Sequence, residues 1–259
     1  MQLKPEHKEY ILKHEQDIRD NNWGKFFEYG KYPDGIGEPL YAAKLPFMLE
    51  LGYVPERTFY MSTNITNIVI PNNVISMGYS ALEGCTNLQS ITLPFVGSRL
   101  RGTTNTHLGY IFGATNYSAN NSCVPSSLKS VVITTANYIG DSAFSDCTGL
   151  TSISIPESVT KIGYLAFCNC TGLTNIEIPK NVRTIQAAAF SGCSNLATVK
   201  ICANNIEIED SAFSDLPTNL TIIYNGTKDE WKNIYNKYAF KHTYFTVNCT
   251  DGVIIKKRK

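Results

Sequence analysis

Charged side chains are scarce in this sequence. They make up 17% of the 259 residues, and the formal net charge is only +1. Proteins that hold nucleic acid or an anionic membrane by bulk electrostatics usually carry a clear excess of positive charge. The composition therefore argues against nucleic acid as the main partner. The basic run at residues 256–259 is more typical of a solvated tail.

Long apolar runs are also missing. No stretch approaches the roughly 18 consecutive apolar residues that a membrane-spanning helix requires, so we expect no membrane span. The opening residues, MQLKPEHKE, lack the apolar segment of a secretory signal. The chain as given is therefore expected to be cytoplasmic. A cell-surface or secreted location is expected only if a leader has been removed.

Recognisable catalytic motifs are absent as well. The four histidines, His7, His14, His107 and His242, lie in three separate regions of the chain. No zinc-protease, nucleophile-elbow, phosphate-loop or dinucleotide-binding pattern occurs. We therefore expect no catalytic, cofactor-binding or metal-binding residues, and a protein that is not an enzyme.

What the sequence does contain is a repeat of 23 residues, seen best in the segments that begin at Leu150 and Leu173. These segments read LTSISIPESVTKIGYLAFCNCTG and LTNIEIPKNVRTIQAAAFSGCSN, and they match at all nine positions that define the repeat pattern. Copies with more variation begin at Ile65, Leu88, Leu128, Leu196 and Leu220. Repetition of this kind predicts a solenoid, in which each coil packs on its neighbours.

Each part of the repeat predicts one part of a coil. The L-x-x-I-x-I run alternates, which predicts a short strand with its isoleucines inside, and the proline ends that strand. Burying about seven apolar side chains yields roughly 10–20 kcal/mol, whereas ordering about 23 residues costs roughly 25–45 kcal/mol in backbone entropy. A single coil is therefore unstable, and contacts between coils must supply the difference.

Four cysteines recur at one position of the repeat, namely Cys85, Cys147, Cys170 and Cys193. A free cysteine behaves as a small buried hydrophobe. The C-x-C at residues 168–170 also differs from the C-x2-C pairs of zinc ribbons. We expect a ladder of buried thiols rather than disulfides or a metal site.

The pattern L-x-x-I-x-I-P-x-x-V-x-x-I-G-x-x-A-F-x-x-C resembles the BspA-like class of leucine-rich repeats, which occurs in bacterial and some protist proteins. The resemblance covers roughly residues 63–224. It implies an α/β solenoid, right-handed, with a parallel β-sheet on its concave face. It also implies adhesion or protein recognition, usually at cell surfaces, and hence another protein as the partner.

Segments on either side of the repeats predict caps. Residues 1–62 do not repeat, and apolar residues at helical spacing after Pro5 predict a helical N-terminal cap on the first coil; a separate partner-docking domain is the alternative. Residues 225–259 contain a capping box, Thr227 to Glu230, that opens a helix, then a β-hairpin and the basic tail. The solenoid is expected to occupy residues 63–224.

Residues 95–127 interrupt the coil that begins at Leu88. Insertions in solenoids map to one face and often carry binding, and this one is rich in residue types that recur at interface hot spots. The candidates are Arg99, Arg101, His107, Tyr110, Phe112 and Tyr117. The alternative is structural, with the apolar residues of the insertion packed on the neighbouring coil.

The concave face of the predicted sheet is a second candidate surface. Its residues are the strand positions that point away from the core, which are mostly small and uncharged in the middle coils. Such a face suits broad protein contact better than a small-ligand pocket. The candidates on it are Ser152, Ser154, Glu177, Lys200 and Tyr224.

The sequence thus predicts a non-catalytic protein-binding module that acts in adhesion, as a scaffold or in recognition. The alternative is a cytosolic inhibitor, encoded by a phage or another mobile element, that occludes a host enzyme or nucleic-acid complex. The missing signal favours the alternative, and the resemblance favours the first hypothesis.

Overall fold

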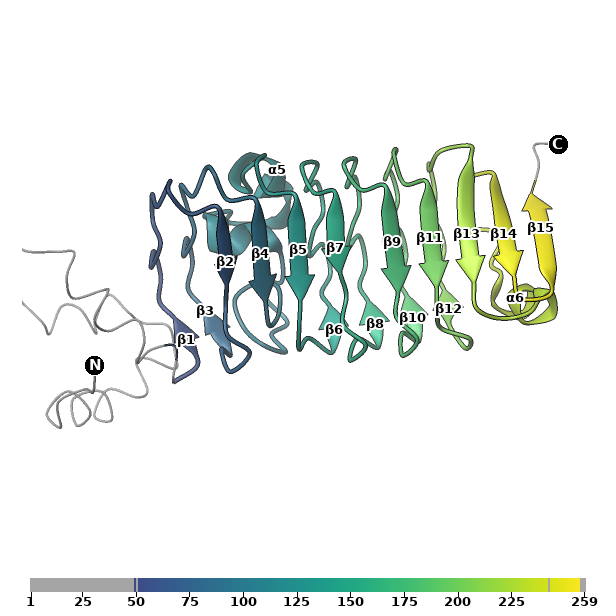
Figure 1. Ribbon diagram of the computed structural model, residues 1–259, viewed down its shortest axis with the longest axis horizontal. Helices are drawn as coiled ribbons and strands as arrows, with labels where there is room; N and C mark the ends of the chain where they lie inside the picture. The colour runs from purple at the N-terminus through teal and green to yellow at the C-terminus, as the bar shows by residue number, and fades with distance from the viewer. Residues whose placement is uncertain (1–48, 50, 242, 257–259) are drawn as a thin grey trace, which may run out of the picture.

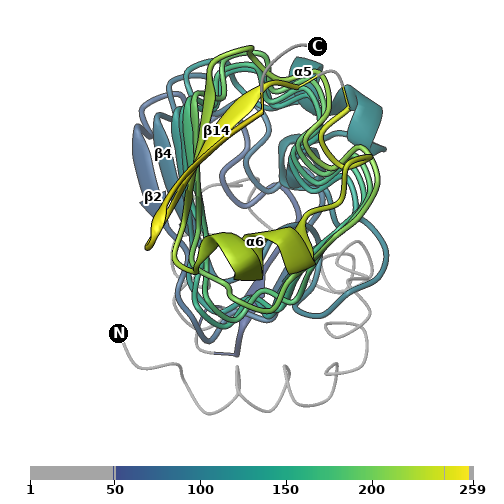
Figure 2. The same cartoon turned by 90° about the vertical axis from the view of Figure 1, so that its right-hand side faces the viewer.

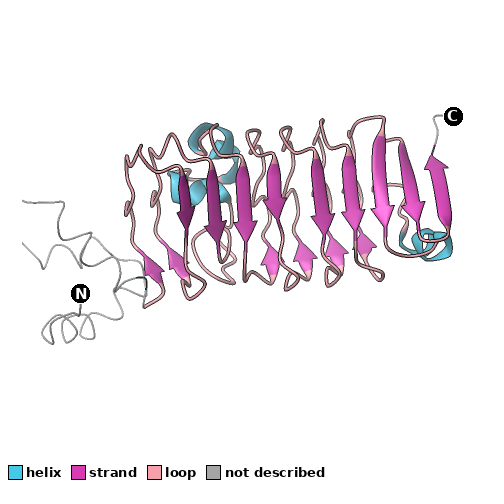
Figure 3. Ribbon diagram, viewed as in Figure 1, coloured by secondary structure: helices cyan, strands magenta, loops and turns pink. Residues whose placement is uncertain are grey.

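The computed structural model describes residue 49, residues 51–241 and residues 243–256. In this part of the chain the backbone winds into a parallel β-solenoid whose coils superimpose when viewed along the axis (Figures 1 and 2). The predicted leucine-rich-repeat solenoid is confirmed. Helix contributes little to it (Figure 3). The helical cap predicted for residues 1–62 falls largely outside the described residues.

One wall of the solenoid is a long sheet of parallel strands that ends in one antiparallel strand. Within it, β7 and β9 lie side by side but belong to separate hydrogen-bonded ladders. The strands are β2 (Asn67–Val69), β4 (Ser90–Leu93), β5 (Ser130–Ile133), β7 (Ser152–Ser154), β9 (Asn175–Ile178), β11 (Thr198–Ile201), β13 (Leu220–Tyr224), β14 (Phe245–Cys249) and β15 (Gly252–Lys256). Burial alternates along them as the L-x-x-I-x-I pattern predicts: in β9, Ile176 and Ile178 are inside.

A second wall is formed by short strands, which the V-x-x-I part of the repeat supplies. They are β1 (Tyr53–Val54) paired with β3 (Ser76–Met77), and the ladder of β6 (Tyr138–Ile139), β8 (Lys161–Ile162), β10 (Thr184–Ile185) and β12 (Glu207–Ile208). The pair β1–β3 is parallel, like the other coil pairs. Coil structure therefore begins before residue 63, the expected boundary of the solenoid.

The turns between the walls carry a continuous stack of phenylalanine rings. Ring centroids in successive coils lie 5.2, 5.0, 5.1 and 5.2 Å apart, with interplanar angles of 1–12°. This spacing follows from the strand separation of about 4.8 Å, and it gives the offset parallel packing that aromatic rings favour. All five rings are fully buried: Phe144, Phe167, Phe190, Phe213 and Phe240.

The predicted ladder of buried thiols is confirmed, because all four repeat cysteines are at most 2% exposed. The structure adds a polar role for them. Cys170 Sγ donates to the Phe144 carbonyl at 3.1 Å, and Cys193 Sγ donates to the Phe167 carbonyl at 3.0 Å. In the last coil, the Thr243 hydroxyl makes the equivalent bond, at 2.8 Å, to the carbonyl of Phe213. A thiol or hydroxyl at this position thus satisfies a buried carbonyl of the preceding coil.

The C-terminal end of the interior is closed by the predicted helix and hairpin. Helix α6 (Lys228–Ile234) begins with the capping box of Thr227 and Glu230, and β14 pairs antiparallel with β15. Trp231 on this helix is 2% exposed, and its ring packs 6.0 Å from that of Phe240 and 6.3 Å from that of Phe245. Figure 2 shows α6 lying across the end of the solenoid. The cap therefore ends the ring stack by covering its last member.

Truncating one ring should destabilise the solenoid strongly. We expect Phe190→Ala to lower the free energy of unfolding by about 3–5 kcal/mol, because it leaves a cavity and breaks two ring contacts. Urea denaturation followed by circular dichroism measures the change. The control is Tyr164→Ala, whose side chain is exposed and which should shift stability by about 0.5 kcal/mol or less. Equal effects of the two substitutions would contradict the stack.

The thiol ladder predicts two reactivity classes in the folded protein. Burial raises the pKa of the Cys193 thiol to about 12 and the pKa of Cys170 well above its usual value. Since the thiolate is the reactive species, Ellman's reagent should label only the half-buried thiols before urea is added, and all thiols afterwards. The half-buried thiols are Cys123, Cys168, Cys202 and Cys249. Rapid labelling of Cys170 or Cys193 in the folded state would contradict this arrangement.

Candidate functional site

The outer face of the long sheet is the broadest regular surface of the solenoid. We call it the outer face, and it consists of the outward side chains of β2, β4, β5, β7, β9, β11, β13, β14 and β15. In the middle strands most of these side chains are polar, and the small residues Ser152 and Ser154 on β7 are both exposed. The structure therefore places these two predicted residues on the surface.

Two further predicted residues meet on this face. Lys200 Nζ lies 3.1 Å from Glu177 Oε1, across the paired strands β11 and β9. The hydrogen bond from Lys200 lowers the pKa of the Glu177 carboxyl, and the same bond raises the pKa of Lys200. Cys202 Sγ donates to the same carboxylate oxygen at 3.3 Å. The pair is exposed to solvent, so it fixes the local charge pattern more than it stabilises the fold.

The structure corrects the prediction for Tyr224. The comparison of the repeat copies predicted an outward side chain for Tyr224. In the structure this side chain is 1% exposed and packs edge-on against Trp231. In the observed register Tyr224 pairs with Ile201, an inward position, so the true alignment of this coil is shifted by one residue. A slip of one residue turns every side chain of a strand to the opposite face. Ile223, and not Tyr224, therefore lies on the outer face.

Exposed aliphatic side chains lie toward the two ends of the outer face. Val69 is 71% exposed near one end, and Ile223, Val253 and Ile255 are 39%, 55% and 60% exposed near the other. The prediction missed the last two, because it treated the final hairpin only as a cap. Val253 and Ile255 occupy alternate positions of the predicted hairpin strand, and this pattern could have shown that they share one face. In the structure they pair with outward residues of β14.

The insertion at residues 95–127 completes the walls of the solenoid. It contains η1 (Leu108–Phe112), η2 (Tyr117–Ala119) and α5 (Asn120–Cys123). Its segment at residues 98–100 runs antiparallel beside β3, with Met77 N–H donating to the Ser98 carbonyl at 2.8 Å. Farther on, Leu82 N–H donates to the Ile111 carbonyl at 2.7 Å, and Leu108 N–H donates to the Ala143 carbonyl at 2.7 Å. These bonds continue the ladder between coils, as the structural alternative requires.

The six predicted contact residues of the insertion divide by burial. Arg99, Arg101 and Tyr117 are exposed, and Tyr110 is half-buried. His107 and Phe112 are only 5% and 2% exposed. The latter two therefore belong to the interior, which corrects their assignment as surface contacts. The other four remain candidates for partner contact.

His107 has an incomplete set of hydrogen bonds. Its Nδ1 lies 3.2 Å from Oδ1 of the fully buried Asn120, which also accepts from Gly109 N–H at 2.9 Å. Because that oxygen can only accept, Nδ1 carries the proton. Nε2 is then a bare acceptor, buried without a partner among the described residues. Burial lowers the pKa of His107, and the bond to Asn120 opposes this shift.

Across the described ranges, no group of three or more His, Cys, Asp or Glu side chains is arranged to hold a metal ion. No helix among these residues combines the length and apolar character needed to cross a bilayer.

The repeating strand–turn coils with a leucine, isoleucine and phenylalanine interior define a leucine-rich-repeat protein. The profile of the BspA type leucine rich repeat region matches residues 45–101 and 118–246, in 6 copies. The chain therefore belongs to the BspA-type leucine-rich-repeat family. No curated protein matches it.

Among solved structures, the chain is similar to a leucine-rich repeat protein from Bacteroides ovatus ATCC 8483, with TM-score 0.51 and 25% identity over 77% of this chain and 46% of the other. It thus spans less than half the length of that relative. A leucine rich repeat protein of T. pallidum matches with TM-score 0.36 and 20% identity, over 74% of this chain and 79% of that one. A leucine rich cell surface protein of Faecalibacterium prausnitzii A2-165 matches with TM-score 0.30 and 20% identity, over 67% and 64% of the two chains.

The buried imidazole of His107 predicts a pH-dependent stability. Its folded pKa lies below the unfolded value of about 6.5, so the unfolded state binds more protons at lower pH. Stability should therefore fall as the pH drops below about 6.5, by at most about 1.4 kcal/mol per pH unit for this one group. Urea unfolding at pH 7.5 and at pH 5 measures it.

The matched variant is His107→Gln, whose amide can still donate to Asn120 but does not titrate. We expect its stability to depend less on pH than that of the unmodified protein. Parallel pH profiles for the two proteins would contradict the role of His107.

Proposed function

We propose that this chain is a non-catalytic protein-binding module that engages its partner through the outer face of the long sheet. The observation that carries the proposal is the set of exposed valine and isoleucine side chains near both ends of an otherwise largely polar sheet face. Val69 on β2 and Ile255 on β15 are 71% and 60% exposed. Exposed apolar groups framed by polar ones are typical of interaction surfaces.

The shape of the outer face favours a large partner. Eight strand spacings separate β2 from β15, which corresponds to about 40 Å at about 4.8 Å per strand. The small side chains of Ser152 and Ser154 let a partner approach the sheet closely at β7. A surface of these proportions suits another protein better than a small ligand, which is usually held in a concave pocket.

The repeat architecture supports the same function. Inward positions are fixed by packing between coils, whereas outward positions are free to vary in chemistry without loss of the fold. Ion pairing between Glu177 and Lys200 shows how neighbouring outward positions can set a local charge pattern. Membership in a leucine-rich-repeat family is consistent with protein binding.

Charged side chains placed in the centre of the outer face should disrupt binding. We expect Ser152→Arg combined with Ser154→Arg to reduce recovery of the specific partner by about tenfold or more, which corresponds to about 1.4 kcal/mol. The measurement is quantitative mass spectrometry of cross-linked proteins from the native cell, with the folded chain as bait.

The control carries two arginines at exposed turn positions, Thr148→Arg and Tyr164→Arg, and should retain the partner. Circular dichroism confirms that both variants are folded. Equal recovery with the outer-face variant and the control would exclude the outer face as the binding surface.

A further inference from the structure

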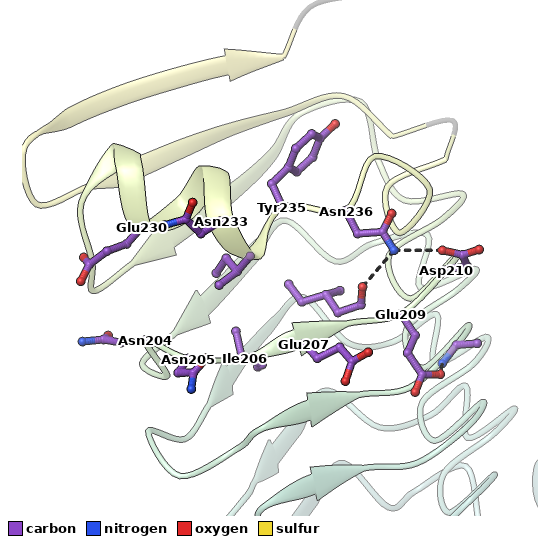
Figure 4. Close-up of a pocket in the computed structure, with 13 residues that line it drawn as sticks. Asn204, Asn205, Ile206, Glu207, Glu209, Asp210, Glu230, Asn233, Tyr235 and Asn236 are labelled. Carbon is purple, nitrogen blue, oxygen red and sulfur yellow. Dashed lines mark hydrogen bonds between the residues drawn. The ribbon is translucent and has the colours of Figure 1, made fainter.

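The short wall of the solenoid ends at β12. Each earlier strand of the ladder β6-β8-β10 is followed by a parallel neighbour in the next coil, but after Tyr224 the chain forms α6 instead. A groove of about 790 Å³ lies between β12 and this helix (Figure 4). Asn204 to Asp210 line one side of the groove, and Glu230 and residues 233–236 line the other.

One residue that lines the groove, Ile206, is 3% exposed and carries a backbone acceptor of the kind that earlier coils use for stacking. In the preceding coil, the Arg183 carbonyl accepts from Glu207 N–H at 2.8 Å. The register of β10 and β12 makes the Ile206 carbonyl the equivalent acceptor one coil later. The carbonyl of Ile208 is capped at 3.1 Å by the side-chain amide of Asn236, as Figure 4 shows. The Ile206 carbonyl receives no hydrogen bond from any described residue.

The walls of the groove carry an excess of negative charge. Its four carboxylates are Glu207, Glu209, Asp210 and Glu230, and no lysine or arginine is among the residues that line it. Three of them accept hydrogen bonds only from uncharged donors: Glu209 from Ala187 N–H, Asp210 from Asn236 and Glu230 from Thr227. No described residue forms an ion pair with any of the four.

We infer that this groove binds an extended, basic segment of a partner protein, which adds a strand beside β12. The segment would donate a backbone N–H to the Ile206 carbonyl, as the next coil would. Alternate lysine or arginine side chains would face Glu207 and Glu230, and the side chains between them would contact the half-buried Ile234 and Tyr235. Strand addition of this kind draws affinity from the main chain and specificity from alternate side chains. The groove is separate from the outer face and does not depend on it.

A direct test uses the full chain and a synthetic blocked peptide of alternating lysine and valine, seven residues long. Fluorescence anisotropy at about 50 mM salt, where screening is weak, should show saturable binding of this peptide. The same peptide with glutamate in place of lysine should not bind. Backbone amide shifts of Glu207 and Ile208 should change on binding, which places the peptide at β12.

Glu207→Lys should weaken binding of the basic peptide by about tenfold or more, because it reverses a charge in the groove. The matched control is Glu157→Lys, an equal charge change at an exposed position away from the groove, and it should change the affinity by less than about twofold. Glu207→Gln provides the milder variant. An equal loss in Glu207→Lys and Glu157→Lys would reduce the effect to general electrostatics and overturn the proposal.

A series of peptides, each N-methylated at one residue, tests strand addition itself. Removing the N–H that faces Ile206 should weaken binding by about tenfold, whereas methylation of its neighbours, whose N–H groups face away, should have little effect. The loss should therefore be confined to one position of the peptide, because the neighbouring Ile208 carbonyl already accepts from Asn236. A uniform effect, or no binding of the basic peptide at all, would overturn the proposal.

Discussion

Stacking of each coil on its neighbours is the interaction on which the whole molecule depends. A coil of this length buries too few side chains to offset the entropy lost when its backbone is ordered. The parallel ladders and the phenylalanine rings spaced 5.0–5.2 Å apart supply what a single coil lacks. Because every ring must meet the ring above and the ring below, its position within the repeat is fixed. This requirement explains why the interior residues repeat so regularly.

The irregular parts of the chain meet the same requirement by other means. The insertion departs from the repeat in sequence, yet it still forms hydrogen bonds with the coils on either side. The Ile111 carbonyl accepts from one coil, and the Leu108 N–H donates to the other. In the last coil, Thr243 replaces the repeat cysteine and still satisfies the carbonyl of Phe213. Asn236 replaces a missing strand at the carbonyl of Ile208. In each case a backbone group keeps a hydrogen-bond partner, although a residue outside the repeat pattern supplies it.

This constraint also explains how much could be predicted from the sequence. Inward positions such as Ile176, Phe190 and Cys193 follow from a strict repeat, so the fold, the buried thiols and the C-terminal cap were predictable. Tyr224 was misplaced because the last copy is degenerate, and an alignment without strand pairing cannot detect a shift of one residue. His107 and Phe112 resembled contact residues by type, since residue type alone does not report burial. The groove beside β12 was invisible because it arises from what the chain omits: the strand that would follow in the next coil.

The places where stacking is relaxed are therefore the places where this chain is free to bind. Side chains on the outer face do not pack in the interior, so Val69 and Ile255 can be apolar and exposed without disturbing the stacking of the coils. At the end of the short wall, stacking stops while the Ile206 carbonyl still faces the position of the next coil. The Ile206 carbonyl and the carboxylates beside it together offer a backbone acceptor and negative charge. These are the two features that an extended basic chain would need in a binding site. The long wall closes with a hairpin and the short wall with a helix, which leaves the Ile206 carbonyl at β12 without a neighbouring strand. The different endings of the two walls thus give the solenoid two chemically distinct surfaces, one broad and nearly uncharged and one narrow and acidic.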